Sequence, residues 1–433
     1  MTDFPPERWS FALRVGFRFA FVYIVLYVFP WPLDLLPGLN KIAGPTTWLW
    51  IKLTQFVGSR LLRLPHDLSE IPTNGTGDST FSYVQTLCSL LLSLLLTVGW
   101  TWLGRSRQEY RREHALLVTY LRYFLAGQMF SYGMVKVIKD QFSDIGLDRL
   151  VQPFGDASPM GLLWTFMGYS TAYTFFAGVM ELFGGLLLLS HRTTLVASLL
   201  LVGVMSNVVL LNFCYDVPVK IHSAHFLIFT VVLIAPHLHR LCAFLLETEI
   251  PLVRAHPARP LARRSVLALQ LLKLVLIALI VIPPTLFAWR DPRHRASQPP
   301  YPPRYGIYDV ELFVRNGEVL PPCFTETTRW RRVIVNQYGG FSIQLADDSL
   351  VRFRLEEDSV KQQITLLPYE GEDPKDVKQR YSLSSSQPSP DVWQIEGMLR
   401  GERINAHLHR VKPRSFMLTS RGFHFVNEVY LNR

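Results

Sequence analysis

The sequence predicts an α-helical polytopic membrane bundle followed by a soluble antiparallel β barrel or sandwich, and three observations support this prediction. Only 18% of the 433 residues are charged and 49% are hydrophobic, whereas soluble proteins carry about a quarter charged residues. Apolar runs of about 20 residues, long enough to cross a hydrocarbon layer of about 30 Å, recur between residues 11 and 289. Beyond residue 300 the pattern becomes polar and alternating.

About seven segments are expected to span the membrane. They cover approximately residues 12–34, 81–103, 114–138, 170–190, 193–213, 221–245 and 265–289. The densest basic clusters, at 104–114 and 253–265, both lie on the cytoplasmic side when the spans alternate from a cytoplasmic N-terminus. An odd number of spans then places the C-terminal domain outside the cytoplasm.

Two short helices are expected between the spans. The segment "GPTTWLWIKLTQFVGSRLLRL" at 44–64 is apolar with basic residues spaced along it, which predicts an amphipathic helix lying in the membrane interface. Ser158 followed by Pro159 fits a helix N-cap and a first-turn proline. A second short helix is therefore expected to begin there.

From Tyr305 onwards, about eight or nine short segments carry apolar residues at alternate positions, with Gly, Asn, Asp or Pro between them. This pattern predicts a small antiparallel barrel or sandwich. The predicted domains are N-terminal spans with the interfacial helix at 1–104, a four-span bundle at 105–250, the seventh span and linker at 251–298, and an extracytoplasmic β domain at 299–433.

The charge distribution gives no reason to expect a nucleic-acid partner, and the cysteine spacing gives none to expect disulfides or a metal site. The net charge of +10 arises largely from Arg residues in short loops beside apolar spans, which is typical of membrane topology, so no nucleic-acid partner is expected. The four cysteines, Cys88, Cys214, Cys242 and Cys323, share no metal-ligand spacing. Neither a disulfide framework nor a metal site is predicted.

The third predicted span carries Gln128, Tyr132 and Lys136 at a spacing of four, which places them on one helical face. An ionisable side chain in hydrocarbon costs about 3 kcal/mol or more unless it is paired or hydrated. We therefore expect this face to point into the bundle. The alternative is that Lys136 extends to the membrane surface.

The fourth predicted span carries Glu181 as a single mid-span carboxylate, with Gly178 and Gly185 nearby at helical spacing. The glycines are typical of close helix packing. If Glu181 faces the bundle, it requires a cation or holds a proton.

The segment "NFCYDVPVKIHSAHF" at 212–226 interrupts two apolar runs with polar side chains. Asn212, like Asn207 before it, is expected to bridge helices. Asp216 begins a turn between the fifth and sixth spans, and Lys220 follows it.

His222 and His225 differ by three positions, so they share one side of the sixth span. Three interpretations remain open: two ligands of a metal or haem, part of a polar ligand pocket, or an anchor for the hairpin. A metal site requires two further ligands, which the sequence does not show.

Four runs together resemble the DoxX family of bacterial membrane proteins, in a longer multi-domain form. They are "YFLAGQMFSYGMVKVIKDQF", "GDASPMGLLWTFMGYS", "ELFGGLLLLSHRTT" and "NVVLLNFCYDVPVKIHSAH". The resemblance covers 114–245, a four-span unit, and is closest at "ELFGG" and "RTT". The closing "FMLTSRGFHFVNEVYLNR" also resembles the end of the longer members.

The resemblance implies a location in the inner membrane of a bacterium and an association with quinone-linked oxidoreduction. The unit is also similar in architecture to the membrane part of vitamin K-dependent carboxylase-like proteins, which handle a naphthoquinone. A quinone-like or lipid-like molecule between the helices is therefore the expected ligand. No residue matches a known catalytic motif.

Two functions are weighed, and whether the protein is an enzyme stays open. In the first, a membrane oxidoreductase or its subunit receives electrons from a redox partner. The candidate proton-transfer residues are Glu181, Lys136, His222 and His225, and the candidate ligand-binding residues are Gln128, Tyr132, Asn207, Asn212, Asp216 and Lys220. In the second, an envelope assembly protein binds a partner, lipid or glycan through its β domain, with "RGFHFVNE" at 421–428 as the candidate segment. Transport is the least supported class, because the sequence shows no inverted repeat.

Overall fold

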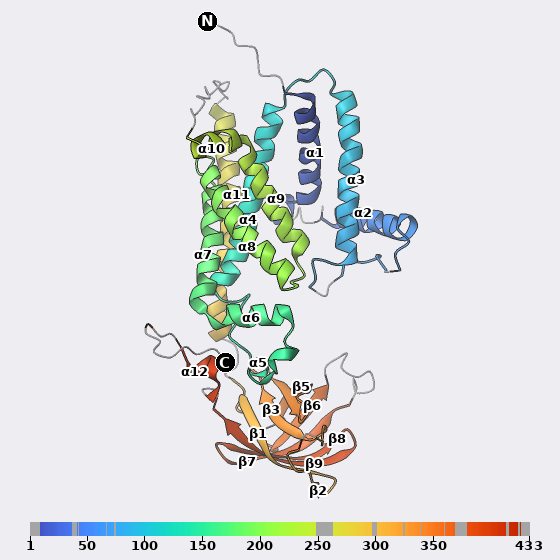
Figure 1. Ribbon diagram of the computed structural model, residues 1–433, viewed down its shortest axis with the longest axis vertical. Helices are drawn as coiled ribbons and strands as arrows, with labels where there is room; N and C mark the ends of the chain where they lie inside the picture. Colours follow the sequence, from blue (N-terminus) through green and yellow to red (C-terminus); the bar gives the residue numbers. More distant parts are fainter. Residues whose placement is uncertain are drawn as a thin grey trace. The chain divides into compact units, whose positions relative to one another are not determined.

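The computed structural model divides into two compact units (Figure 1). A helical unit comprises Met1–Phe142 and Ser170–Pro292, and a barrel unit comprises Ser143–Tyr169 and Arg293–Arg433. The structure describes residues 9–36, 41, 43–65, 67–72, 75–247, 263–296, 301–323, 325–337, 339–358, 360–368, 379–412, 415–422 and 425. The connection between the third and fourth predicted spans thus belongs to the barrel unit.

Every predicted span contains a helix. The helices of this unit are α1 (Phe11–Val28), α2 (Ala43–Phe56), α3 (Thr80–Leu103), α4 (Arg111–Val137), α7 (Thr171–Leu188), α8 (Thr194–Cys214), α9 (Lys220–Ile234), α10 (Leu238–Leu245) and α11 (Arg263–Ala296). Short turns η1 (Leu33–Leu35), η3 (Val57–Leu61, a π-helical turn) and η5 (Ala235–His237) lie between them.

Six helical segments are long and apolar enough to cross a membrane, which confirms the prediction of a membrane protein in its coarse form. They are Phe11–Leu35, Thr80–Leu103, Thr171–Leu188, Thr194–Cys214, Lys220–Leu245 and Arg264–Arg290. Among the predicted spans, α4 is outside this set, because Arg122, Gln128 and several tyrosines lower the mean hydropathy of its apolar run.

Prolines change two of the predicted spans. The helix in the first span ends at Val28, whereas the apolar run continues to residue 34, because Pro30 and Pro32 offer no amide hydrogen and force extended backbone before them. Pro236 similarly separates α9 from α10 through the turn η5.

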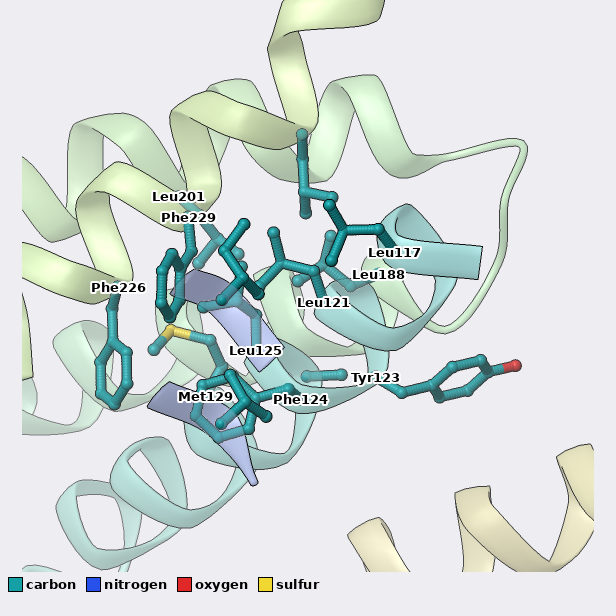
Figure 2. Packing of buried hydrophobic residues seen from close by; sticks show 14 of the residues in the cluster. Leu117, Leu121, Tyr123, Phe124, Leu125, Met129, Leu188, Leu201, Phe226 and Phe229 are labelled. Carbon is teal, nitrogen blue, oxygen red and sulfur yellow. The ribbon is translucent and has the colours of Figure 1, made fainter. Parts of the chain in front are cut away.

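The helical core is built around α4. This helix packs against α1, α7 and α9, while α8 packs against both α7 and α9, so α4, α7, α8 and α9 form a closed arrangement of four helices. Figure 2 shows Phe226 and Phe229 of α9 lying beside Met129 of α4, whereas Tyr123 points away from this cluster. Leu121 and Leu125 of α4 are fully buried. Much of α11 is exposed, as expected of a surface that faces lipid.

Both predicted short helices are present. Ser158 accepts a hydrogen bond from the amide of Gly161 at 3.1 Å, and α6 begins at Pro159 as expected. In the helical unit, α2 and η3 cover the predicted interfacial segment, and α2 lies across the direction of α3 (Figure 1).

The C-terminal strands form one antiparallel sheet in the order β2-β1-β3-β4-β5-β6-β7-β8-β9, and the pairing of β1 with β9 closes it into a barrel. The strands are β1 (Gly306–Arg315), β2 (Glu318–Val319), β3 (Trp330–Val335), β4 (Gly340–Leu345), β5 (Leu350–Asp358), β6 (Gln363–Pro368), β7 (Tyr381–Ser389), β8 (Val392–Leu399) and β9 (Glu402–Val411). Of the two predicted β architectures, the barrel is therefore correct. Its core contains the fully or almost fully buried rings of Tyr308, Phe341, Phe353 and Trp393.

The inserted segment contains α5 (Leu147–Val151), η4 (Phe154–Asp156) and α6 (Pro159–Tyr169), and α5 packs on the outer surface of the barrel. The apolar contact joins Leu147 and Val151 of α5 to Ile307 of β1 and Ile334 of β3. The Asn336 amide donates to the Asp148 carboxylate at 2.9 Å, and the Gln344 amide donates to the Val151 carbonyl at 3.1 Å. These polar and apolar contacts fix α5 on the barrel.

Candidate functional site

The helices α4 and α7 approach closely through glycines. A Cβ atom added to Gly178 would lie 2.7 Å from the carbonyl oxygen of Gly133, and one added to Gly133 would lie 2.8 Å from that of Gly178. One on Gly185 would lie 3.0 Å from the Cβ atom of Met129. The predicted packing role of Gly178 and Gly185 is confirmed, and larger side chains would separate the two backbones.

This close approach brings a lysine and a glutamate together. Lys136 Nζ lies 2.8 Å from Glu181 Oε2, and the two side chains are only 10% and 4% exposed. Lys136 therefore stays in the helix interface instead of extending to the membrane surface, and Glu181 has the cation that its position requires. Such a desolvated pair is stable only while both partners are present.

At the other end of the same interface, Arg122 binds a helix terminus. Its Nε and Nη2 groups donate to the carbonyl oxygen of Leu188 at 3.0 and 2.9 Å. Leu188 is the last residue of α7, whose final carbonyls have no partner within the helix. Arg122 thus caps α7 and fixes its position against α4.

A second polar group lies where α1 meets α9. We call it the tyrosine–histidine cluster, and it consists of Tyr23 and Tyr27 of α1, Tyr132 of α4, and His222 and His225 of α9. His225 Nδ1 lies 2.7 Å from the Ile221 carbonyl, which can only accept, so Nδ1 carries the hydrogen. In neutral His225, Nε2 is then the acceptor for the Tyr23 hydroxyl at 2.6 Å. The backbone therefore fixes the tautomer of His225.

Tyr27 completes the surroundings of His225. Its ring stacks on the imidazole with centroids 4.1 Å apart and planes inclined by 10°. Its hydroxyl is buried and has no hydrogen-bond partner among the described residues. Because buried hydroxyls normally find an acceptor, this phenol can donate to an oxygen supplied by a ligand or water.

The cluster is contiguous with the lysine–glutamate pair. Lys136 Nζ lies 5.7 Å from the centre of the Tyr132 ring. The Tyr132 ring is 6.2 Å from Phe226, which is 6.4 Å from His222. Side chains of α1, α4, α7 and α9 thus form one continuous polar and aromatic region.

Asp216 and Lys220 anchor the hairpin between α8 and α9. Lys220 Nζ lies 2.8 Å from Asp216 Oδ1, and the carboxylate of Asp78 accepts the backbone amides of Lys220 and Ile221 at 2.7 and 2.9 Å. Asp78, which precedes α3, therefore caps the start of α9. These contacts of Asp216 and Lys220 anchor the hairpin, and the three interpretations of His222 and His225 stay open.

The remaining predicted ligand-binding residues, Gln128, Asn207 and Asn212, take no part in the contacts described above for the lysine–glutamate pair and the tyrosine–histidine cluster. Asn207 is exposed, Asn212 is buried and Gln128 is partly buried. Among the described residues, no group of three or more His, Cys, Asp or Glu side chains is placed to hold a metal ion. Of the C-terminal candidate segment, His424, Asn427 and Glu428 lie outside the described residues.

Sequence reasoning missed Tyr23, Tyr27 and Asp78. The spacing of four between Tyr23 and Tyr27 was an available signal, because it places two phenols on one face of an apolar helix. Asp78 gave no local signal, since the amides that it caps lie about 140 residues further along the chain.

Comparison with known proteins identifies one relative. The chain is 31% identical over 133 residues to the uncharacterized protein YwoB of Bacillus subtilis (strain 168), a match that covers 30% of this chain and 81% of YwoB. The chain belongs to the same family as YwoB. No family model and no solved structure matches the chain.

Proposed function

We propose that the protein is a multi-pass membrane protein of the DoxX type that binds a quinone-like molecule and serves as a quinone-linked oxidoreductase or its membrane subunit. The observation that carries this proposal is the buried, unpartnered hydroxyl of Tyr27 stacked on His225. A quinone carbonyl accepts such a donor, and its ring matches the flat aromatic surroundings. The closed arrangement of α4, α7, α8 and α9 supports a DoxX-like four-helix unit.

The chain's own residues would handle protons in this function. Reduction of a quinone to a quinol consumes two electrons and two protons, and the electrons would come from a redox partner protein. Tyr23 donates to His225 Nε2, which gives a short path for proton exchange. Lys136 and Glu181 form a second pair that would exchange a proton. Tyr132, whose ring lies beside Lys136, would connect this pair to the tyrosine–histidine cluster.

We assign α4 as the seventh span. At 27 residues and 1.5 Å per residue it is about 40 Å long, which exceeds the hydrocarbon layer. Its cations Arg122, near the middle of the helix, and Lys136, in its last turn, are buried against α7, where a carbonyl and a carboxylate satisfy them. Its low hydropathy therefore agrees with a helix surrounded by other helices instead of lipid.

The contact of α5 with the barrel supports the proposed topology. Four apolar helical segments (α7, α8, α9–α10 and α11) separate the α5 segment from the barrel along the chain, and an even number of crossings returns the chain to the same side. With the N-terminus in the cytoplasm of a bacterium and seven spans, that side is extracytoplasmic.

The native cysteines test this topology. A membrane-impermeant maleimide applied to right-side-out vesicles should label Cys214, which ends α8, and Cys323 of the barrel unit, but spare Cys242 of α10. Inverted vesicles should give the opposite pattern. Labelling of Cys242 and Cys323 from the same side would refute the assignment.

Quinone binding is tested on the full chain in mild detergent with menadione, a naphthoquinone, as the probe. We expect menadione to raise the melting temperature of the wild type and of Tyr83→Phe, which alters an exposed tyrosine of α3. Tyr27→Phe should weaken binding about fivefold, the effect of one hydrogen bond of about 1 kcal/mol. Absence of binding, or equal binding to Tyr27→Phe, would refute the proposal.

One observation favours the alternative, an envelope protein whose barrel binds a partner, lipid or glycan. Arg304 and Glu357 pair inside the barrel, yet Arg304 Nη1 and Glu357 Oε2 are buried without hydrogen-bond partners. A donor and an acceptor side by side suit a hydroxyl group, as in a glycan. Binding of the full chain to a glycan array, abolished in Glu357→Gln, would support this function.

A further inference from the structure

The helix α2 and its π-helical continuation η3 carry an exposed row of aromatic and basic side chains. Trp48, Lys52, Phe56 and Arg60 follow each other at a spacing of four, which places them along one ridge of the helix. Trp48 and Phe56 are 60% and 57% exposed, and Lys52 and Arg60 are exposed as well. Arg63, which is also exposed, follows just after the helix ends. We call these five residues the aromatic–basic ridge.

The opposite face of the same helix is firmly packed. Val57 belongs to a buried cluster with Leu68, Phe81, Val84 and Cys88. Gly58 permits this packing, because a Cβ atom there would lie 2.2 Å from the Leu68 side chain. The ridge is therefore exposed on a helix that the rest of the unit holds in place.

The location of the helix matches a membrane surface. Phe81 and Val84, which the helix contacts, lie in the first turns of α3, a helix long and apolar enough to span a bilayer. The helix α2 lies across α3 at this end (Figure 1). Aromatic rings and cations at the end of a span lie at the depth of the lipid headgroups.

The charge of the segment selects the kind of headgroup. Between Asp34 and Asp67 the sequence contains Lys41, Lys52, Arg60 and Arg63 and no Asp or Glu. Among the described residues, Lys52, Arg60 and Arg63 make no ion pair, so their charges are available to phosphate groups. We propose that the aromatic–basic ridge binds the headgroups of anionic phospholipids. This explains why a loop on the proposed extracytoplasmic side, where cations are usually sparse, carries three of them in the ridge.

The experiment uses the full chain in phosphatidylcholine nanodiscs that contain an equal mole fraction of either brominated phosphatidylglycerol or brominated phosphatidylcholine. The signal is the part of the tryptophan quenching that disappears in Trp48→Phe. We expect brominated phosphatidylglycerol to quench Trp48 about twofold more strongly or better. The excess should vanish in about 1 M NaCl, where the Debye length falls to about 3 Å.

Charge variants make the test specific. The combined change Lys52→Gln, Arg60→Gln and Arg63→Gln should equalise quenching by the two lipids without changing the melting temperature. A control with the same loss of charge on exposed residues of the barrel unit, namely Arg354→Gln, Lys361→Gln and Lys412→Gln, should keep the preference.

Three results would overturn the proposal. Equal quenching by both lipids in the wild type would show that the ridge does not select anionic headgroups. No quenching of Trp48 by either lipid would show that the ridge lies away from the bilayer. Loss of the preference in the control variant would assign it to the net charge of the protein. The test is independent of quinone binding, because it uses neither the tyrosine–histidine cluster nor a quinone.

Discussion

Both units of the protein bury an ion pair, but they do so with different cations. In the helical unit, Lys136 lies 2.8 Å from Glu181, and in the barrel unit, Arg304 lies 2.9 Å from Glu357. The Arg304 guanidinium also stacks 4.6 Å from the centre of the Trp393 ring. The lysine lies instead in the contact between two helices, beside the carbonyl of Tyr132.

The difference indicates different roles. A guanidinium is planar and keeps its proton under all ordinary conditions, so Arg304 stabilises the barrel interior through stacking and a fixed charge. An ammonium and a carboxylate can both become neutral if one proton moves between them, which a desolvated environment favours. The pair in the barrel is thus suited to structure, whereas the pair in the bundle has proton exchange as an added role in the proposed function.

Removal of one partner from the bundle pair has the largest expected effect. Lys136→Met leaves the Glu181 carboxylate buried without a cation, which should lower the free energy of unfolding by about 3–5 kcal/mol. Lys136→Met combined with Glu181→Gln should recover much of this loss. The measurement is the melting temperature in detergent, and Lys273→Met on the exposed part of α11 is the matched control. Equal melting temperatures for Lys136→Met and the control would mean that the pair does not stabilise the bundle.

The next largest effect concerns the helix contact that creates this pair. In Gly178→Ala the new methyl group would lie 2.9 Å from the Lys136 Cβ atom and 2.7 Å from the Gly133 carbonyl, so α4 and α7 must separate. Overpacking of this kind costs about 1–3 kcal/mol. Gly203→Ala on α8 is the control, because no atom lies within 4 Å of its added Cβ atom. A melting temperature for Gly178→Ala at or above that of Gly203→Ala would contradict the close contact.

The barrel pair is expected to require arginine specifically. Arg304→Lys keeps the charge but loses the planar stacking on Trp393, and the expected loss is about 1–2 kcal/mol. Arg354→Lys on the exposed face of β5 should be neutral. Denaturant unfolding followed by tryptophan fluorescence measures both variants. If Arg304→Lys is as stable as Arg354→Lys, the planar stacking on Trp393 does not stabilise the barrel, and a lysine could replace Arg304 in its ion pair.

The positions of the helices could be predicted from sequence because the length and hydropathy of each apolar run are properties of its own residues. The partners of the buried polar groups could not, because they come from distant segments. Arg18 illustrates this limit. It lies within the first predicted span and nothing near it in the sequence indicates a partner, yet it is 2% exposed and donates to the Tyr110 hydroxyl at 2.7 Å and to the Gly104 carbonyl at 3.1 Å.

The candidate site was partly predictable for the same reason. Glu181 and Lys136 were identified one at a time, since a charge inside a span is unusual wherever its partner lies. Tyr27 was missed because a tyrosine in an apolar helix is ordinary, and only the stacking on His225 distinguishes it. The placement of α5 on the barrel was likewise unpredictable, because its contacts join residues almost 200 positions apart.

The smallest expected effects on stability are those of Tyr23→Phe and Tyr27→Phe. Their comparison distinguishes a hydroxyl that holds the bundle together from one that is available to a ligand. Tyr23→Phe removes the 2.6 Å hydrogen bond to His225 and should cost about 1 kcal/mol. Tyr27→Phe removes a hydroxyl that has no partner among the described residues, so the change in the absence of quinone should stay within about 0.5 kcal/mol. Melting temperatures of quinone-free protein decide between the two. A loss in Tyr27→Phe as large as that in Tyr23→Phe would mean that the Tyr27 hydroxyl already has a structural partner, and that Tyr27, like Arg304, serves the fold.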